Sequence, residues 1–316
     1  MSEGEPVLNL ARLLHPMSMT TFFAEWWERR PLHIARGDGT WYGELLAMRD
    51  VDALIAFADP RGPDIRATKQ GDAAAYPITF SGKMGSARGD GSVDINRVYA
   101  AYRAGYTINV NRVQLYWAPV AALCAALEDA LDHEVIASLF LAPASSQGFD
   151  AHYDAHDVFV VQLEGAKRWR LRAPVENLPL RSGVVGELDG ELLMDVTLQA
   201  GDLLYVPSGT VHEVRTDDRA SLHLTIGIVA TRWLELIREA LNGIAADDVR
   251  LRRAVPLDNR GEIEAGLRAL LPAVVANARA DVAVERLRAA AAAARPQPVV
   301  PGHFAELDLL ADGVPS

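Results

Sequence analysis

Two short segments hold side chains that could bind one metal ion together. The first reads QGFDAHYDAHDVFVVQLEGAKRWRL over residues 147–171 and contains His152 and Asp154. The second reads GDLLYVPSGTVHEV over residues 201–214 and contains His212. Residues two positions apart in a strand face the same side, so His152 and Asp154 can reach one ion. Two imidazoles and one carboxylate form the facial triad of non-haem iron oxygenases, which leaves coordination positions open.

The sequence around His212 strengthens this interpretation. Gly201 and Asp202 are typical of a turn, residues 203–206 of a strand, and residues 207–209 of a second turn before the strand that His212 opens. A His-x-Asp pair alone is frequent by chance. Its combination with this strand-turn-strand pattern favours a metal site with His152, Asp154 and His212 as ligands.

The remaining histidines are predicted to have other roles. His156 follows His152 and Asp154 in a segment whose sequence is typical of a loop. We expect it to line the mouth of the site and not to bind the metal, because Asp154 already completes the triad. His223 is expected to be an interior strand residue. The others stand alone in the sequence and are interpreted as structural: His15, His33, His133 and His303.

The sequence pattern of the central chain predicts a β-sandwich or a β-barrel. Short apolar runs separated by Gly, Pro, Ser and Asp favour many short strands and not alternating strand–helix units. The predicted strands cover residues 135–141, 158–163, 168–171, 193–198, 203–206 and 222–229, with a turn at Gly165 between the second and third. The fold class expected from this pattern is mainly β with α.

The flanking regions are predicted to be partly helical. Apolar residues at helical spacing predict helices at 20–30, 41–58 and 94–104 before the barrel, and a helix that Pro119 opens. After the barrel, helices are expected at 233–244 and 262–295, and residues 86–92 are expected to form a flexible loop. The predicted domains are therefore 1–230 as the catalytic barrel, 231–295 as a helical region for dimerisation, and 296–316 as a tail.

Composition limits the partners that the chain can have. The chain has 316 residues, is 50% hydrophobic and carries a formal net charge of -11. This acidity disfavours a duplex nucleic-acid partner and suits a basic protein or peptide. The one cysteine, Cys124, lies in an apolar run and excludes a Cys-rich metal site. The acidic N-terminus lacks the basic start of a signal peptide, and no apolar stretch is long enough to span a bilayer, so we expect a cytoplasmic protein.

The same residues resemble a known family. The segments SQGFDAHYDAHDVFVVQLEGAKRWRL, GDLLYVPSGTVHEV and SLHLTIGI are similar to the JmjC-domain cupins of the ribosomal oxygenase group. FFAEWWERRPLHIARGD at 22–38 and VNRVQLYWAPVAALCAALED at 110–129 also resemble this family. The resemblance implies a double-stranded β-helix (cupin) barrel as the fold. It also implies Fe(II) held by the triad and 2-oxoglutarate as co-substrate. It further implies hydroxylation of an Arg or His side chain in a ribosomal protein, and a homodimer formed through the C-terminal helices.

The resemblance also implies that Lys167 pairs with the distal carboxylate of 2-oxoglutarate. Independent reasoning agrees, because a lysine buried in a barrel needs an anionic partner. The sequence departs from the family pattern where some members carry Asn and Tyr, since Ser138 and Phe140 stand there. Ser138 can still donate a hydrogen bond and Phe140 cannot. Ser138 and Thr225 are therefore the further residues expected to contact the co-substrate.

Three alternatives stay open from the sequence. The chain has no room for the winged-helix domain of longer family members, which leaves a small peptide or a free amino acid as possible substrates. A metal cupin enzyme that does not use 2-oxoglutarate is the second alternative, although Asp154 and Lys167 disfavour it. A non-catalytic cupin that binds or scaffolds a partner is the third, and the complete triad disfavours it.

Overall fold

The structure is a computed structural model that divides into two compact units. It describes residues 8–58, 60, 64–72, 76–79, 92–186 and 188–294. One unit ends at Val229, and the second begins at Ala230. The predicted tail at 296–316 lies outside the described residues, as does the predicted loop 86–92 apart from its last residue.

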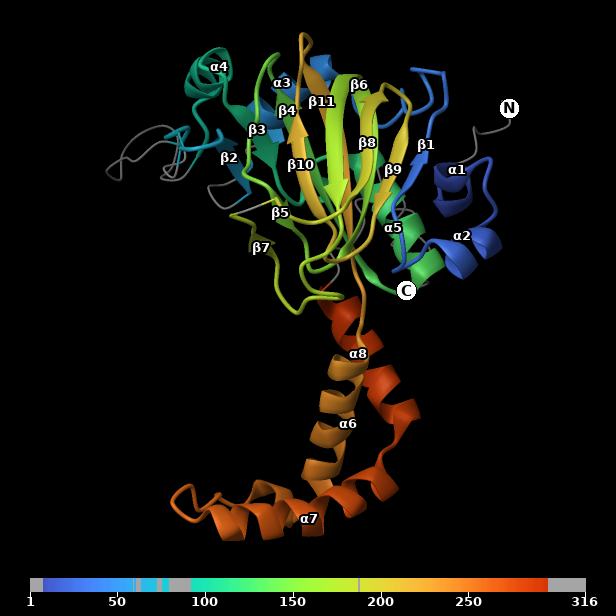
Figure 1. The fold of residues 1–316 in the computed structure, drawn as a ribbon, viewed down its shortest axis with the longest axis vertical. Helices are drawn as coiled ribbons and strands as arrows, with labels where there is room; N and C mark the ends of the chain where they lie inside the picture. Colours follow the sequence, from blue (N-terminus) through green and yellow to red (C-terminus); the bar gives the residue numbers. More distant parts are fainter. Residues whose placement is uncertain are drawn as a thin grey trace, which may run out of the picture. The chain divides into compact units, whose positions relative to one another are not determined.

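The first unit is built on an antiparallel sheet of eleven strands that curls on itself. The strands are β1 (Leu32–Ile34), β2 (Ile65–Thr68), β3 (Thr107–Val110), β4 (Glu134–Ala142), β5 (His152–Tyr153), β6 (Asp157–Arg172), β7 (Gly183–Val184), β8 (Leu192–Gln199), β9 (Leu203–Val206), β10 (Val211–Arg215) and β11 (Ser221–Val229). One layer has the order β2-β3-β4-β11-β6-β9-β1, and the other has the order β8-β6-β10-β5-β7. Strand β6 belongs to both layers, and β10, β6 and β8 run side by side in Figure 1. The predicted cupin fold is confirmed.

The long strand β6 differs from the sequence-based expectation. Two strands separated by a turn at Gly165 were expected, and the structure has one strand of 16 residues. Gly165 has a φ of +68°, and an added Cβ would lie 1.9 Å from the carbonyl oxygen of Ala220. The glycine therefore bends β6 at the point where its pairing partner changes from β11 to β8, without ending the strand.

Alternating side chains separate two hydrophobic cores. On β11, Leu222, Leu224 and Ile226 face a large core that the sheet shares with the helices. Because strand side chains alternate, His223 and Thr225 lie on the opposite face. That face encloses a second, smaller core formed by Val158, Val160, Trp169, Leu171, Leu198, Leu204 and Val206. The polar residues of the site thus lie on the inner face of the barrel.

Helices of the first unit cover the outer face of the sheet. They are α1 (Leu10–Leu14), α2 (Met19–Glu25), α3 (Met48–Ala58), α4 (Ile95–Arg103) and α5 (Ala118–Leu131), with a short 3-10 turn at Val113–Leu115. Helices α1, α2 and α5 lie beside β1 on one side of the sheet (Figure 1). The helices predicted at 20–30 and 41–58 are shorter than expected, because turns occupy residues 26–29 and 41–45.

The second unit contains helices only. These are α6 (Trp233–Asp247), α7 (Arg260–Asn277) and α8 (Ala280–Ala294), with a 3-10 turn at Val249–Arg252. The single helix expected at 262–295 is interrupted between Asn277 and Ala280. Ala283 is the one buried side chain among the described residues of this unit. Across the described residues, no helix has the length and apolar character needed to cross a membrane.

Candidate metal and co-substrate site

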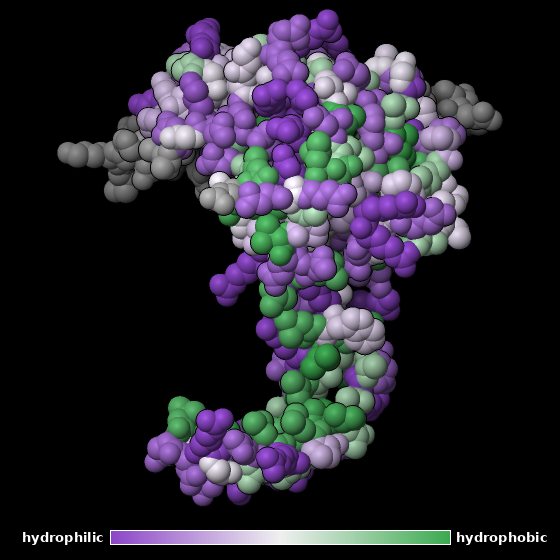
Figure 2. Space-filling model, viewed as in Figure 1, coloured by the Kyte–Doolittle hydropathy of each residue, from purple (hydrophilic) through white to green (hydrophobic). Residues whose placement is uncertain are grey.

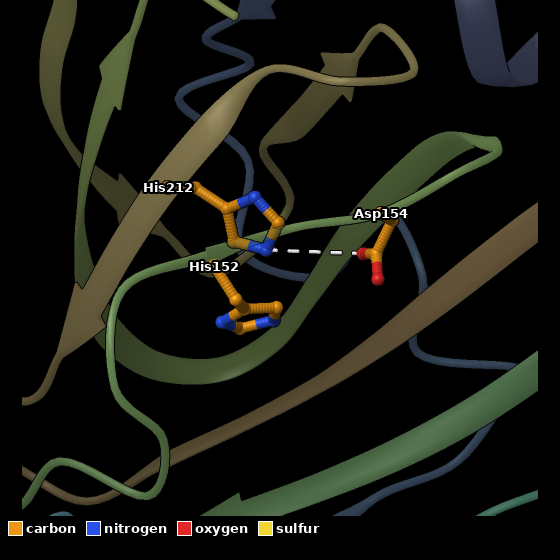
Figure 3. Close-up of side chains that lie close together, drawn as sticks. All are labelled: His152, Asp154 and His212. Atoms are coloured by element: carbon orange, nitrogen blue, oxygen red, sulfur yellow. Dashed lines mark ion pairs between the residues drawn. The ribbon is translucent and has the colours of Figure 1, made fainter. Parts of the chain in front are cut away.

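The structure brings His152, Asp154 and His212 together inside the barrel. His152 lies on β5 and His212 lies opposite it on the neighbouring strand β10. One potential ligand atom from each of the three residues lies within 4.8 Å of the other two. Figure 3 shows the two imidazole rings and the carboxylate converging, with 3.8 Å between His212 Nε2 and Asp154 Oδ2. Among the described residues this is the one cluster of its kind.

Hydrogen bonds fix the orientation of both imidazoles. His152 Nδ1 donates to the carbonyl oxygen of Asp150 at 2.8 Å, and His212 Nδ1 donates to that of Thr210 at 3.1 Å. A carbonyl can only accept, so Nδ1 carries the proton and each Nε2 keeps its lone pair for a metal. Burial and the nearby His152 lower the pKa of His212 to about 4. His212 is therefore neutral at physiological pH, as a ligand must be.

A glycine turn positions Asp154 relative to β10. The sequence suggested that Asp154 lies in the same strand as His152. In the structure Asp154 lies one residue beyond the end of β5. Its carbonyl oxygen accepts a hydrogen bond of 2.8 Å from the amide of Gly209. Gly209 has a φ of +84°, and an added Cβ would lie 2.6 Å from the carbonyl oxygen of Glu176. Only glycine fits there, and the turn before His212 holds the backbone of Asp154 in place.

A cavity of about 370 Å³ extends from the triad into the barrel. Lys167 lines it and is buried, at 6% exposure. No ion pair or hydrogen bond connects its ammonium group to the described residues, and burial lowers the pKa of Lys167 to about 7. Its Nζ lies 6.0 Å from the centre of the Phe140 ring. A buried lysine without a counter-ion fits a cavity that receives an anion.

The other residues predicted to contact the co-substrate line the same cavity. Ser138 on β4 and Thr225 on β11 are paired across the two strands. Phe140 stacks on His223, with ring centres 4.9 Å apart. Burial and then the charge of Lys167 lower the pKa of His223 well below its ordinary value, and its Nδ1 has no hydrogen-bond partner among the described residues. The neutral His223 forms part of the cavity wall as well as of the strand interior.

The sequence did not indicate several residues of the cavity wall. Asn111 directly follows β3 and Arg66 lies on β2, both far from the metal-binding segments in the chain. Trp169 on β6 stacks on His212, with ring centres 5.8 Å apart. No motif marks them, because only strand pairing brings them to the site. His156 also lines the cavity, and its ring lies against Gly227, where an added Cβ would be 2.7 Å away.

A second cavity, of about 560 Å³, adjoins the first. Both cavities are lined by residues 148–150 and by His152. The second is otherwise bordered by residues 68–72 on one side and by Tyr153 with residues 182–184 on the other. The metal-binding residue His152 thus stands where the two cavities meet.

Comparison with known proteins identifies the family. Residues 114–236 match the family model of the JmjC domain. The matched segment contains the complete triad and most of the barrel, so this part of the chain is a JmjC domain. Its relatives belong to the ribosomal oxygenase group.

Two relatives illustrate this similarity. The bifunctional lysine-specific demethylase and histidyl-hydroxylase NO66 of Drosophila persimilis is 31% identical over 79% of this chain and 36% of that protein. Ribosomal oxygenase 1 of Danio rerio is 33% identical over 78% of this chain and 46% of that protein. The chain thus spans less than half the length of these curated relatives.

Solved structures share the fold. The X-ray structure of E. coli ycfD has a TM-score of 0.53 at 19% identity and covers 82% of this chain and 68% of that chain. The structure of YcfD, a ribosomal oxygenase from E. coli, in complex with cobalt and 2-oxoglutarate has a TM-score of 0.51 at the same identity, over 82% and 67%. At this identity the likeness establishes the fold, and the cobalt and 2-oxoglutarate belong to that protein.

Proposed function

We propose that this chain is an Fe(II)- and 2-oxoglutarate-dependent oxygenase that hydroxylates a side chain of a protein or peptide. The observation that carries the proposal is the convergence of His152, Asp154 and His212 at the end of a cavity that also contains Lys167. Three protein ligands would hold ferrous iron and leave positions open for a chelating co-substrate and O2.

The residues of the cavity fit 2-oxoglutarate. Lys167 would pair with its distal carboxylate, since this ammonium group has no anionic partner among the described residues. Ser138 and Thr225 offer hydroxyl groups on the same face of the sheet. The second alternative class, a metal cupin without 2-oxoglutarate, gives no reason for a buried unpaired lysine beside the triad.

Each part of the site has a defined task. When bound, ferrous iron and 2-oxoglutarate supply the O2 activation and oxidative decarboxylation that hydroxylation requires. Asp150 and Thr210 hold the proton on Nδ1 of the two imidazoles, so that each Nε2 faces the metal position. Trp169, Val158 and Val206 form an apolar wall that keeps water from the reacting atoms.

The second cavity supports a polypeptide substrate over a free amino acid. This second cavity of about 560 Å³ meets the metal cavity at His152. It has room for the residues on either side of the side chain that is hydroxylated. The names of the relatives, ribosomal oxygenase and histidyl-hydroxylase, favour an Arg or His side chain of a ribosomal protein. The net charge of -11 suits such a basic partner, and a ribosomal substrate favours a cytoplasmic location.

Mass spectrometry tests the proposed reaction. Purified chain is incubated with Fe(II), ascorbate and 2-oxoglutarate, together with a ribosomal-protein fraction, with short peptides from those proteins, or with free arginine and histidine. We expect the mass of one added oxygen on a protein or peptide, absent with His152→Ala. Oxygen addition to the free amino acids alone would favour the biosynthetic alternative, and no product with any of the three would contradict the proposal.

The helical unit supports a homodimer. Its apolar side chains are largely exposed: Trp233 79%, Ile237 54%, Leu257 86%, Leu271 54% and Val275 76%. Hydrophobic residues gather on the visible surface of α6, α7 and α8 in Figure 2. A second copy of the same unit would cover these residues, because helices without a core of their own become stable by packing on others.

A further inference from the structure

Three neighbouring strands place a row of polar residues along the metal cavity. Thr225 on β11 is paired with Ser138 on β4. Val110, the last residue of β3, is paired with Leu139, so Asn111 follows it opposite Ser138. Ser138 Oγ donates a hydrogen bond of 3.2 Å to Asn111 Oδ1. Asn111, Ser138 and Thr225 all line the cavity, and we refer to them as the polar row.

The polar row lies next to the position of the lysine ammonium group. Ser138 and Phe140 are two residues apart on β4 and face the same side. Lys167 Nζ lies 6.0 Å from the centre of the Phe140 ring. An anion that pairs with Lys167 therefore has the polar row beside it, and the stacked rings of Phe140 and His223 line the same cavity.

The backbone of Asn111 is held by an ion pair behind the cavity. Its amide donates to the carbonyl oxygen of Asp64 at 2.6 Å. Arg112, with a left-handed φ of 52°, binds the buried Asp64 carboxylate through two hydrogen bonds of 2.8 Å each, and Tyr116 donates to the same carboxylate. These contacts fix Asn111 at the end of β3, and its side-chain amide nitrogen makes no hydrogen bond to the described residues.

The chemistry of the polar row distinguishes its members. The hydroxyl proton of Ser138 is used on Asn111. The amide group of Asn111 keeps two N–H donors, which a carboxylate can accept. We propose that Asn111 is the second donor to the distal carboxylate of 2-oxoglutarate beside Lys167, and that Ser138 acts by orienting Asn111. This inference rests on the proposed function, and it assigns to the residue that follows β3 a role that the sequence placed on β4.

Calorimetry with two related ligands tests the inference. Protein loaded with Mn(II), which does not turn over, is titrated with 2-oxoglutarate and with 2-oxobutyrate, which lacks the distal carboxylate. In Asn111→Ala we expect 2-oxoglutarate affinity to fall roughly ten- to a hundredfold, the range of a hydrogen bond to a charged group. Affinity for 2-oxobutyrate should stay within about twofold, since it lacks the group that Asn111 binds.

Three further variants complete the test. Asn111→Asp has nearly the same shape and sets a negative charge against the carboxylate, so the loss should exceed that of Asn111→Ala. Asn96→Asp makes the same change at an exposed position of α4 and should bind as the wild type does. If Asn111→Ala does not fold, Asn111→Asp and Ser138→Ala, which should show a smaller loss confined to 2-oxoglutarate, decide the question.

The outcomes separate this inference from the proposed function. Unchanged 2-oxoglutarate binding in Asn111→Ala overturns the inference and leaves the function standing. Equal losses for both ligands also overturn it, because Asn111 would then shape the cavity and not bind the carboxylate. A wild-type protein that binds Mn(II) without binding 2-oxoglutarate overturns both.

Discussion

The barrel unit and the helical unit bury their apolar residues to very different degrees. In the barrel, both faces of the curled sheet carry fully buried side chains such as Phe159, Leu171 and Leu224. In the helical unit, Ala283 alone is buried among the described residues, while Trp233 and Leu257 are 79% and 86% exposed. The barrel thus has what an independent domain needs, and the helical unit lacks a core.

This difference indicates a division of tasks between the units. Every residue that the proposed chemistry uses lies in the barrel unit, on its strands or on the turns beside them. The helical unit contributes a surface, which we propose to be the contact with a second copy. Substitutions in the helical unit should therefore leave metal and co-substrate binding unchanged, and substitutions in the barrel site should leave dimerisation unchanged.

The largest expected effect is on metal binding. His212→Ala removes a buried ligand, and Mn(II) affinity should fall by more than about a hundredfold, because even residues that only support a ligand contribute roughly ten- to a hundredfold. Fluorescence or calorimetric titration with Mn(II) measures it. Trp233→Glu in the helical unit is the control and should bind Mn(II) normally. Normal metal affinity in His212→Ala would remove this histidine from the triad.

The next effect concerns the co-substrate. Lys167→Met removes the ammonium group and leaves an unbranched side chain that is one atom shorter. We expect 2-oxoglutarate affinity of the Mn(II)-loaded protein to fall by about a hundredfold or more, the effect of deleting one partner of a buried charge pair. Mn(II) affinity itself should not change. Equal 2-oxoglutarate affinity in the variant and the wild type would show that the distal carboxylate binds elsewhere.

A third prediction concerns association through the helical unit. Trp233→Glu places a charge among apolar side chains and should weaken dimerisation by about thirtyfold, as loss of a large anchor does at an interface. Light scattering over a dilution series measures the change. Phe57→Glu is the matched control, because Phe57 on α3 is 87% exposed in the barrel unit. A wild type that is monomeric throughout the series would contradict the proposed dimer.

The smallest effect is a pH dependence of co-substrate binding. Burial lowers the pKa of Lys167 to about 7, so the lysine is charged below pH 7 and neutral above it. A bound carboxylate favours the charged form and raises this pKa. Binding at pH 8 should take up nearly one proton, and affinity should fall by up to about tenfold per pH unit above 7.

Calorimetry in buffers of different ionisation enthalpy measures the proton uptake. Lys167→Met should show none. Equal uptake in the variant would assign the proton to another group.

Local patterns made the metal triad predictable. His152 and Asp154 are close in sequence, and the Pro-Ser-Gly pattern at residues 207–209 predicts a turn just before the strand of His212. Asn111 was not predictable, since it reaches the cavity only through the pairing of β3 with β4 and through its contact with Asp64. Long-range contacts of this kind leave no local signal in one sequence.

The limits of local patterns also explain the errors in element boundaries. Glycine commonly indicates a turn, yet Gly165 bends β6 because β11 and β8 pair with either side of it. The alanine-rich segment after residue 260 indicates a helix throughout, and the break between α7 and α8 has no glycine to mark it. In the helical unit the spacing of apolar residues predicts the helices correctly. It carries no information about which surface packs against their apolar faces.

Formation of succinate from 2-oxoglutarate tests the central claim most directly, because succinate arises from oxidative decarboxylation of that co-substrate. The purified chain is supplied with Fe(II), ascorbate, O2 and 2-oxoglutarate, with and without a ribosomal-protein fraction. We predict succinate that requires Fe(II) and O2, increases with the fraction and is lost in His152→Ala. Wild-type succinate no higher than that of His152→Ala under both conditions would contradict the assignment of this barrel as a 2-oxoglutarate oxygenase.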